Sequence, residues 1–214
     1  MIKLVFIDFT KTLSSKPALQ SGLEYLHQES LYDEIMRDYK QKIIKTPEER
    51  ISKIFAGWKG LSLNALPEIY ERLKEGLYEG VVEFLSFLSG KDIKYVLCSN
   101  MPTHLEKFFQ KEFGFYRVIG TVLEVKNRKF TGNILKPVYE KGIEVKRIMD
   151  EEGLTPEECV MIGDSEEDVG AWNVVGRDRS IGFNAPKHLE QYLYVNMSHW
   201  KEAPTITESI SNKA

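Results

Sequence analysis

Short apolar runs recur along the chain, and each stops at polar side chains. They occupy residues 4–7, 93–98 and 159–162. Short runs without alternation are typical of strands buried on both faces of a parallel sheet. Apolar residues between the runs recur at helical spacing. The pattern therefore predicts an α/β fold built on a doubly wound, Rossmann-like parallel sheet with right-handed crossovers.

Helical periodicity begins soon after the first run. Leu19, Leu23 and Leu26 share one face of a predicted helix, and Pro47 is suited to the first turn of a later one. The pattern continues to a stop near Gly76. Residues 15–78 are therefore predicted to form an all-helical cap domain, hereafter the helical insertion, within an α/β core domain made of residues 1–14 and 79–214.

The remaining elements continue the alternation of strands and helices. An antiparallel hairpin is expected where residues 118–125 and 130–134 flank the turn at 126–129. The last dozen residues are polar and are expected to fray. Helices are predicted at 80–90, 102–113, 138–152, 165–175 and near 187, and further strands at 180–183 and 192–195.

Charge and composition exclude several classes of function. The formal net charge is −3, and Lys and Arg are scattered among Asp and Glu, so no nucleic-acid partner is expected. No apolar run approaches the roughly 20 residues that span a bilayer, so no membrane partner is expected and a cytoplasmic location is predicted. Cys98 and Cys159 lie inside apolar runs and are predicted to be small buried side chains. A monomer or homodimer is expected.

Candidate chemistry gathers at the carboxyl ends of the predicted buried strands. In a parallel sheet these ends share one edge, so side chains far apart in sequence meet in one crevice. The candidates there are Asp8, Phe9, Thr10, Thr12, Ser99, Asn100, Asp164 and Asp168.

Two charged residues lie on predicted core-facing helical stripes. Asp168 shares a face with Trp172, and Lys141 shares a face with Val145. A buried carboxylate needs a cation or hydrogen-bond donors, because an unpaired buried charge is costly. Several facing acids favour a divalent cation, and carboxylates with carbonyl oxygens and water suit Mg²⁺. Ser99, Thr12, Lys141 and loop amides would then serve as donors to a phosphoryl group, which predicts a small phosphorylated substrate.

These residues resemble the motifs of the haloacid dehalogenase (HAD) superfamily of phosphatases. The family's D-x-D-x-T loop corresponds to residues 8–12, its Ser/Thr to Ser99, its Lys to Lys141, and its Gly-Asp-x-x-x-Asp segment to residues 163–168. The resemblance covers nearly the whole chain, and the helical insertion is similar to the cap of the phosphoserine-phosphatase branch. It implies an aspartyl-phosphate mechanism.

The resemblance also implies a role for each residue. Asp8 would be the nucleophile, and Mg²⁺ would be held by Asp8, the carbonyl of Thr10 and Asp164, with Asp168 in support. Ser99 and Lys141 would stabilise the phosphoryl oxygens, and Lys141 would offset the charge of Asp8.

The first motif departs from the family at its second acid, which is Thr10 here. That aspartate is the family's general acid and base, a contribution worth about 10²–10⁴-fold in rate. The P-type ion pumps, which resemble this superfamily, also carry Asp-x-Thr-x-Thr and form the same intermediate. The leading hypothesis is an enzyme, a small-molecule phosphatase whose proton comes from the insertion, with Asp33, Glu34 and Asp38 as candidate sources, or whose leaving group needs none.

Three other readings stay open. They are a phosphotransferase, a catalytically weak phosphate-binding protein, and a carbon–phosphorus hydrolase. Phosphoserine enzymes of this branch use one acidic and one basic cap residue, and spacing puts Pro17 and Ile54 near those positions. The aromatic residues Phe55, Trp58 and Tyr70 are interpreted as packing between helices rather than as a pocket lining.

Overall fold

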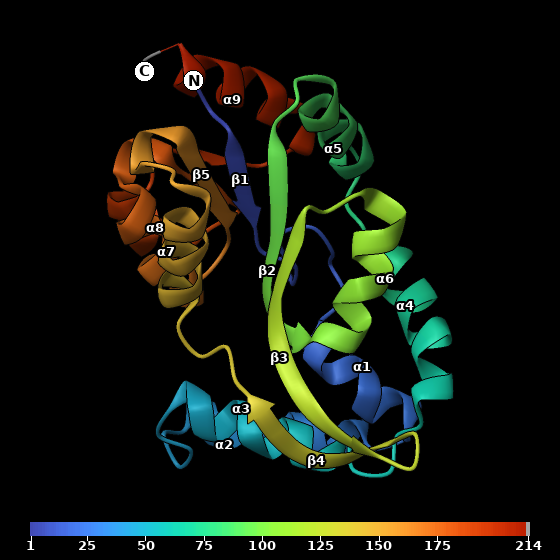
Figure 1. Ribbon diagram of the computed structural model, residues 1–214. Coiled ribbons are helices and arrows are strands. Elements are labelled where there is room, and N and C mark those ends of the chain that lie inside the picture. The colour runs from blue at the N-terminus through green and yellow to red at the C-terminus, as the bar shows by residue number, and fades with distance from the viewer. Residues whose placement is uncertain (213–214) are drawn as a thin grey trace.

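The computed structural model describes residues 1–212 and contains a seven-stranded sheet in the order β4-β3-β2-β1-β5-β6-β7 (Figure 1). All neighbouring strands pair in parallel except β3 and β4, which pair in antiparallel fashion. The predicted α/β fold is confirmed. The strands are β1 (Leu4–Ile7), β2 (Lys94–Pro102), β3 (Arg117–Lys126), β4 (Lys129–Lys136), β5 (Cys159–Gly163), β6 (Ser180–Phe183) and β7 (Val195–Met197).

Helices lie between most of these strands and after the last one. The α-helices are α1 (Ala18–Tyr25), α2 (Glu29–Lys40), α3 (Pro47–Gly57), α4 (Leu66–Lys74), α5 (Val81–Gly90), α6 (Thr103–Phe113), α7 (Lys141–Glu152), α8 (Val169–Val175) and α9 (Ala203–Ser211). Short 3₁₀ segments lie at Leu63–Ala65, Pro156–Glu158, Glu166–Asp168, Arg177–Arg179, Lys187–Tyr192 and Trp200–Glu202.

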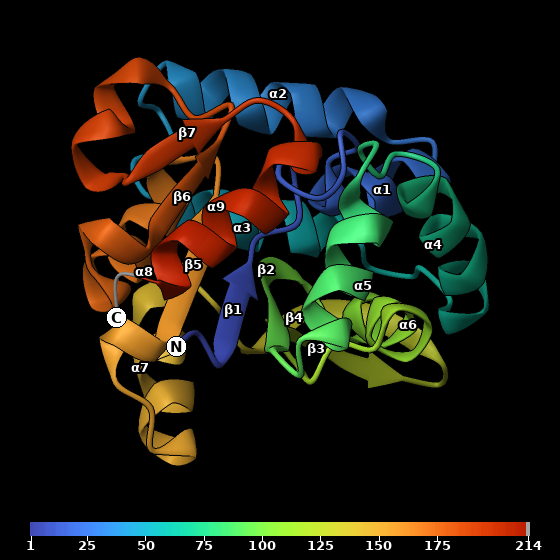
Figure 2. The same ribbon diagram turned by 90° about the horizontal axis from the view of Figure 1, so that it is seen from above.

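The alternation of side chains along β1 divides the core into two layers. Val5 and Ile7 belong to the apolar cluster that includes residues of α5, α6 and α9. Leu4 and Phe6 belong to a second cluster with residues of α7 and α8. Because successive strand residues point to opposite faces, a strand of only four residues contributes to both layers. Helices therefore cover both faces of the sheet (Figure 2).

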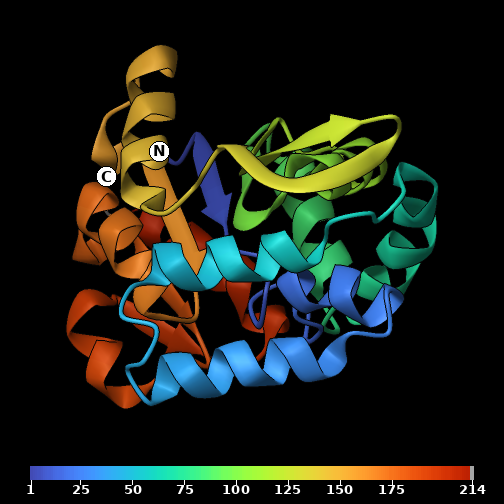
Figure 3. The same cartoon turned by 90° about the horizontal axis from the view of Figure 1, so that it is seen from below.

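The sheet reverses its strand order at β1, which lies between β2 and β5. Ligands of open α/β sheets bind beyond the carboxyl ends of the strands at such a switch point. Asp8 directly follows β1 at this position. Helices α1, α2 and α3 lie across the same end of the sheet (Figure 3).

The β3–β4 hairpin reaches the helical insertion. Its turn residues Asn127 and Arg128 have φ of 51° and 60°, as the tight turns favoured in hairpins require. Phe130 on β4 exchanges backbone hydrogen bonds with residues 60 and 61, of 2.8 and 2.9 Å. Its ring also packs edge-on against Trp58, with centroids 5.8 Å apart. The predicted hairpin is thus confirmed, and it adjoins α3.

The expectation that the last residues fray is wrong for the described part of the chain. They form α9, in which Ala203, Thr207 and Ile210 are buried. Arg179 donates a 2.7 Å hydrogen bond to the carbonyl oxygen of Ile210, and Ile2 N donates to Ser211 Oγ at 3.3 Å. Ala and Thr give a weak apolar pattern, so the sequence did not reveal this face. Residues 213–214 of the predicted frayed segment lie outside the described residues.

Other boundaries differ from the predictions by part of a turn or strand. Strand β2 continues past Cys98 to Pro102, with an irregular register against β3. Helix α7 begins at Lys141, three residues later than expected, and the helix expected from residue 165 begins as a 3₁₀ turn. Cys98 and Cys159 are buried free thiols, as predicted. Within residues 1–212, no helix combines the length and apolar character needed to cross a membrane.

A buried acid lies between α6 and β3, where Glu106 has no exposed surface. Neither of its carboxylate oxygens has a hydrogen-bond partner among the described residues. A Cβ at Gly120 would lie 1.8 Å from Glu106 Oε2, so only glycine leaves room for this side chain. Burial raises the pKa of Glu106 well above its usual value, while the charge of Lys141 opposes that shift. Cys98 also interacts electrostatically with Glu106.

Replacing Glu106 with Gln is expected to change how stability depends on pH. The folded state keeps the Glu106 proton at pH values where the unfolded chain, with an ordinary pKa of 4.5, has released it. Stability therefore falls as pH rises above that value, by up to about 1.4 kcal/mol per pH unit. Urea unfolding at pH 5 and pH 8 should show that the free energy of unfolding of Glu106→Gln increases relative to that of the wild type as pH rises. Glu83→Gln, at an exposed position of α5, serves as the control, and parallel curves for the wild type and Glu106→Gln would refute this expectation.

Candidate active site

The loop after β1 forms a tight turn that begins directly after Asp8. Phe9 turns inward and packs against Phe109, with ring centroids 4.7 Å apart. Its carbonyl oxygen accepts hydrogen bonds from the amides of Thr12, Leu13 and Ser14, of 3.3, 2.9 and 3.0 Å. The Phe9 side chain is therefore part of the core, and any contact with substrate would have to come from its backbone.

Lys141 connects two of the predicted acids. Its Nζ lies 2.5 Å from Asp8 Oδ1 and 2.7 Å from Asp168 Oδ1, and all three side chains are buried. Helix α7 brings Lys141 to this position by packing closely on α8. A Cβ at Gly142 would lie 2.6 Å from the carbonyl oxygen of Gly170, so glycine permits this approach.

The second carboxylate oxygen of Asp168 holds the turn after β5. It accepts hydrogen bonds from the backbone amides of Asp164 and Ser165, at 3.0 and 3.1 Å. A Cβ at Gly163 would lie 2.3 Å from the Asp168 side chain, which explains the glycine at the end of the strand. Asp168 is thus fully engaged, and it fixes the backbone that carries Asp164.

The carboxylates of Asp8, Asp164 and Asp168 lie close enough to hold a metal ion, with one oxygen from each within 4.8 Å of the others. Burial raises the pKa of Asp8 to about 6, although Lys141 opposes the shift. Burial, and then the charges of Asp8 and Asp168, raise the pKa of Asp164 to about 8. Asp8 Oδ2 is buried without a hydrogen-bond partner among the described residues. Buried acids with a free oxygen fit a hard divalent cation such as Mg²⁺.

The predicted hydroxyl groups have different partners. Thr10 Oγ1 accepts a 3.3 Å hydrogen bond from the amide of Ala18, the first residue of α1. Thr12 Oγ1 is buried and donates to Asp164 Oδ1 at 3.4 Å, rather than facing open space. Ser99 Oγ accepts from the amide of Met101 at 3.1 Å, which leaves its proton for another acceptor.

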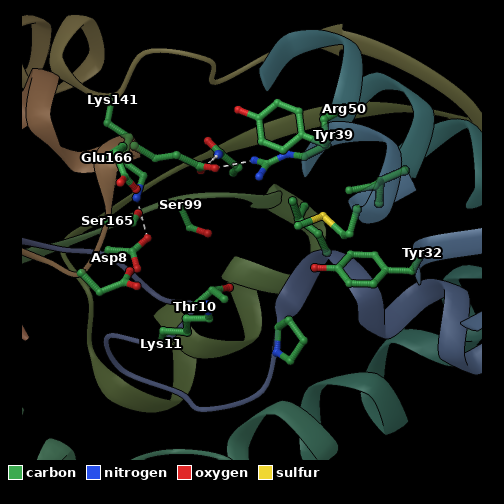
Figure 4. Close-up of a pocket in the computed structure, with 17 residues that line it drawn as sticks. Asp8, Thr10, Lys11, Tyr32, Tyr39, Arg50, Ser99, Lys141, Ser165 and Glu166 are labelled. Atoms are coloured by element: carbon green, nitrogen blue, oxygen red, sulfur yellow. Dashed lines mark hydrogen bonds and ion pairs between the residues drawn. The ribbon is translucent and has the colours of Figure 1, made fainter. Parts of the chain in front are cut away.

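A pocket of about 460 Å³ lies over these groups (Figure 4). Phe9, Thr12 and Asp168 do not line it. The predicted site residues that do are Asp8, Thr10, Ser99, Asn100, Lys141 and Asp164.

Arg50 on α3 is a pocket residue that the sequence analysis missed. Its guanidinium forms an ion pair with Glu167 and lies 4.9 Å from the centre of the Tyr39 ring. Asn100 Nδ2 donates to the same glutamate at 2.6 Å. Spacing had put the basic position at Ile54, which also lines the pocket, but the charge comes from one helical turn earlier. The sequence could have indicated Arg50, because it lies four residues before Ile54 and therefore on the same face of α3.

Several other expectations about the insertion can be compared with the structure. Asp33, Glu34 and Asp38, the candidate proton sources, are absent from the pocket lining. Phe55, Trp58 and Tyr70 are buried in the apolar core, as predicted. The pocket is lined on this side by other residues, which include Tyr32, Met36 and Tyr39 of α2.

The profile of the haloacid dehalogenase-like hydrolases matches residues 5–172. This chain belongs to that family. The predicted resemblance is thereby confirmed over most of this chain, from β1 into α8.

One sequence relative of this HAD protein is a phosphoserine phosphatase from Archaeoglobus fulgidus. The two are 32% identical over 146 residues, which make up 67% of this chain and 40% of the archaeal protein. The chain therefore corresponds to about two fifths of that relative's length.

Solved structures share the HAD fold at lower identity. A phospho-aspartyl intermediate analogue of phosphoserine phosphatase has a TM-score of 0.80 and 19% identity, covering 95% of this chain and 98% of its own. A substrate-bound phosphoserine phosphatase has a TM-score of 0.82 and 18% identity, covering 96% and 98%. A HAD family hydrolase from Salmonella enterica serovar Typhi has a TM-score of 0.85 and 13% identity, covering 95% and 70%. At these identities the likeness shows the fold.

Proposed function

We propose that this HAD protein is a Mg²⁺-dependent phosphatase, a phosphoric monoester hydrolase that acts on a small phosphorylated metabolite. The observation that carries the proposal is the position of Lys141, which holds Asp8 Oδ1 at the base of a pocket while Asp8 Oδ2 has no hydrogen-bond partner among the described residues. Residues 15–78 would form the cap domain over this site. The phosphoserine phosphatase named among its relatives supports the same reaction class.

In the proposed reaction, an Asp8 oxygen attacks phosphorus in line, and the bond between phosphorus and the ester oxygen breaks. The leaving alkoxide takes a proton from water and departs as the alcohol. Water then attacks the phosphorus of the aspartyl phosphate, so that inorganic phosphate and a proton are released and the Asp8 carboxylate is restored. Lys141 orients Asp8 and stabilises its ionised form, and Ser99 and Asn100 are available to phosphoryl oxygens at the pocket wall.

The acidic cluster supplies ligands for the proposed cofactor. Asp8, Asp164 and the backbone carbonyl of Thr10 would hold Mg²⁺, with Asp168 in support. The ion would offset the negative charge of the phosphoryl group and of the facing carboxylates.

The position of Thr10 favours a second candidate function, a phosphotransferase that delivers the phosphoryl group to an acceptor other than water. If phosphate release is slow with every acceptor, the protein would act as a catalytically weak phosphate-binding protein. The hydroxyl oxygen of Thr10 accepts a hydrogen bond from the backbone amide of Ala18 and therefore helps to hold the start of α1. A threonine hydroxyl also does not titrate near neutral pH, so it cannot replace the carboxylic acid of related phosphatases.

Phosphate release from phenyl phosphate, measured with Mg²⁺ and with EDTA, tests the proposed function. We expect release that requires the metal and a transient phosphoryl adduct on the protein, seen by intact mass spectrometry. Adduct formation with slow phosphate release would favour the phosphotransferase. Neither release nor adduct with any ester or acyl phosphate would favour the binding protein.

Because Thr10 replaces the general acid, the rate of hydrolysis should depend strongly on the acidity of the leaving group. Aryl phosphates, whose phenolates leave without a proton, should be cleaved much faster than alkyl phosphates. Thr10→Asp should raise the alkyl phosphate rate by about 10²–10⁴-fold, because it supplies a general acid. Thr10→Asn, which has similar size and no titratable proton, is the control. Equal wild-type rates on aryl and alkyl esters would contradict this account of Thr10.

We propose in addition that the protein acts in the cytoplasm as a monomer or homodimer, without a nucleic-acid or membrane partner. The mixed distribution of Lys and Arg among acidic residues supports the absence of nucleic acid.

A further inference from the structure

The pocket has two ends of different chemistry (Figure 4). One end holds the reacting groups and comes from the α/β core, with Asp8, Ser99 and Lys141 in its wall. The opposite end comes from the helical insertion. Its lining is mostly apolar or aromatic and consists of Pro17, Leu19, Tyr32, Met36, Tyr39 and Ile54.

Charge at the insertion end is already neutralised. Arg50 is the charged side chain that the described part of the insertion contributes to the lining, and it is paired with Glu167. Glu167 also accepts a hydrogen bond from Asn100, and Glu166, which follows β5 in the core, forms a hydrogen bond with His188. The carboxylates of the lining, Asp8, Asp164, Glu166 and Glu167, all belong to the α/β core, and among the described residues the insertion contributes no carboxylate that could pair with a substrate ammonium group.

The two ends set opposite requirements for the two parts of a substrate. A phosphoryl group suits the core end, where Lys141 and the Ser99 hydroxyl are located. An organic group that carries a net charge would lose its hydration at the insertion end without gaining a partner, which is costly. An apolar group of the same size would instead gain from burial, by about fourfold in affinity for each methylene.

We propose that the insertion end binds an uncharged, apolar organic group, so that the substrates are phosphate monoesters of apolar alcohols or phenols rather than phosphorylated amino acids or amines. The proposal rests on the proposed phosphatase function. It also explains why Pro17 and Ile54 stand near the positions where spacing had put the charged residues that recognise phosphoserine.

A series of linear alkyl phosphates separates apolar binding from leaving-group acidity, since simple alcohols differ little in acidity. The kcat/KM of the wild-type protein with Mg²⁺ should rise about fourfold per methylene from ethyl to pentyl phosphate. n-Propyl phosphate and O-phosphoethanolamine form a matched pair that differs by a terminal methyl or ammonium group. The propyl ester should be preferred at least about tenfold. A flat series, or a preference for phosphoethanolamine or phosphoserine, would overturn the proposal.

Met36 offers a variant that tests the location of this end, because it is partly exposed on α2 and lines the pocket. Met36→Glu supplies an acid that can pair with an ammonium group, so it should lower the preference for propyl phosphate over phosphoethanolamine about tenfold or more. Met36→Gln, which is polar and uncharged, should lower it less. An unchanged preference in both folded variants would place the organic group elsewhere and overturn the proposal.

Calorimetric binding to Asp8→Asn gives a readout that does not depend on turnover. The same series should bind more tightly with each methylene, and propyl phosphate more tightly than phosphoethanolamine. If the wild-type protein hydrolyses none of these esters while the binding order holds, the proposed function fails and the inference about the pocket stands. If hydrolysis occurs but the binding order is flat or reversed, the phosphatase stands and the inference fails.

Discussion

Asp8→Asn is expected to lower kcat by on the order of 10⁴–10⁶-fold and to abolish the phosphoryl adduct, because an amide does not replace a carboxylate nucleophile. Asp8 Oδ1 is held by Lys141 and Oδ2 has no hydrogen-bond partner among the described residues, so the carboxylate is oriented with one oxygen available for attack. Phosphate release from phenyl phosphate and intact mass of the protein under turnover measure the two effects.

Asp150→Asn is the matched control for this experiment. Asp150 is exposed on α7 and pairs with Lys146, away from the pocket lining. Turnover and adduct should match those of the wild type. An adduct of equal yield in Asp8→Asn would show that another residue carries the phosphoryl group, and the assignment of Asp8 would be wrong.

Lys141→Met is expected to destabilise the metal-free protein by about 3–5 kcal/mol, because it leaves buried carboxylates without their cation. Lys141 Nζ is within 2.7 Å of both Asp8 and Asp168, and these side chains are 3%, 7% and 0% exposed. At about 2–4 °C per kcal/mol for a chain of this size, Tm should fall by about 6–20 °C. Thermal unfolding in EDTA measures the loss, and activity should fall with it.

Lys146→Met is the control for this substitution. It removes the same charge from the same helix, but its ion pair with Asp150 is about 60% exposed and contributes little to stability. Added Mg²⁺ should recover part of the lost stability in Lys141→Met, because a divalent cation also offsets the acidic cluster. Equal Tm values for the two lysine variants would mean that the buried ion pairs do not stabilise the fold.

Two sequence patterns predicted part of the site: polar residues directly after buried strands, and charged residues on the apolar faces of helices. Asp8, Ser99 and Asp164 follow buried runs, and parallel strands bring such ends to one edge. Lys141 and Asp168 stood out because a charge on a core-facing stripe needs a partner, and in the structure they are each other's partner. These relations depend on local pattern and on general sheet geometry, so the sequence contains them.

The insertion end of the pocket could not be predicted in the same way. When a functional position is located only by its spacing along a helix, the estimate can be wrong by one turn. Spacing placed the basic position at Ile54, whereas the basic residue in the pocket is Arg50. Both Ile54 and Phe55 are nearly unexposed residues of α3, yet only Ile54 lines the pocket. Which apolar side chain borders a cavity depends on how α1, α2 and α3 cross, and hydrophobic periodicity does not specify those crossings.

The β3–β4 hairpin has a consequence for how a substrate reaches Asp8. Its edge strand is hydrogen-bonded to the segment after α3, and the connections into and out of the insertion are joined where Ser15 N and Tyr78 N donate to Gly76 O and Leu13 O. The insertion is therefore bonded to the rest of the chain at the hairpin as well as at its two connections. Of the α-helices of the insertion, α2 has the fewest buried residues, with Ile35 alone, and it carries three residues of the pocket wall. We expect the same helix to admit the substrate and to select it.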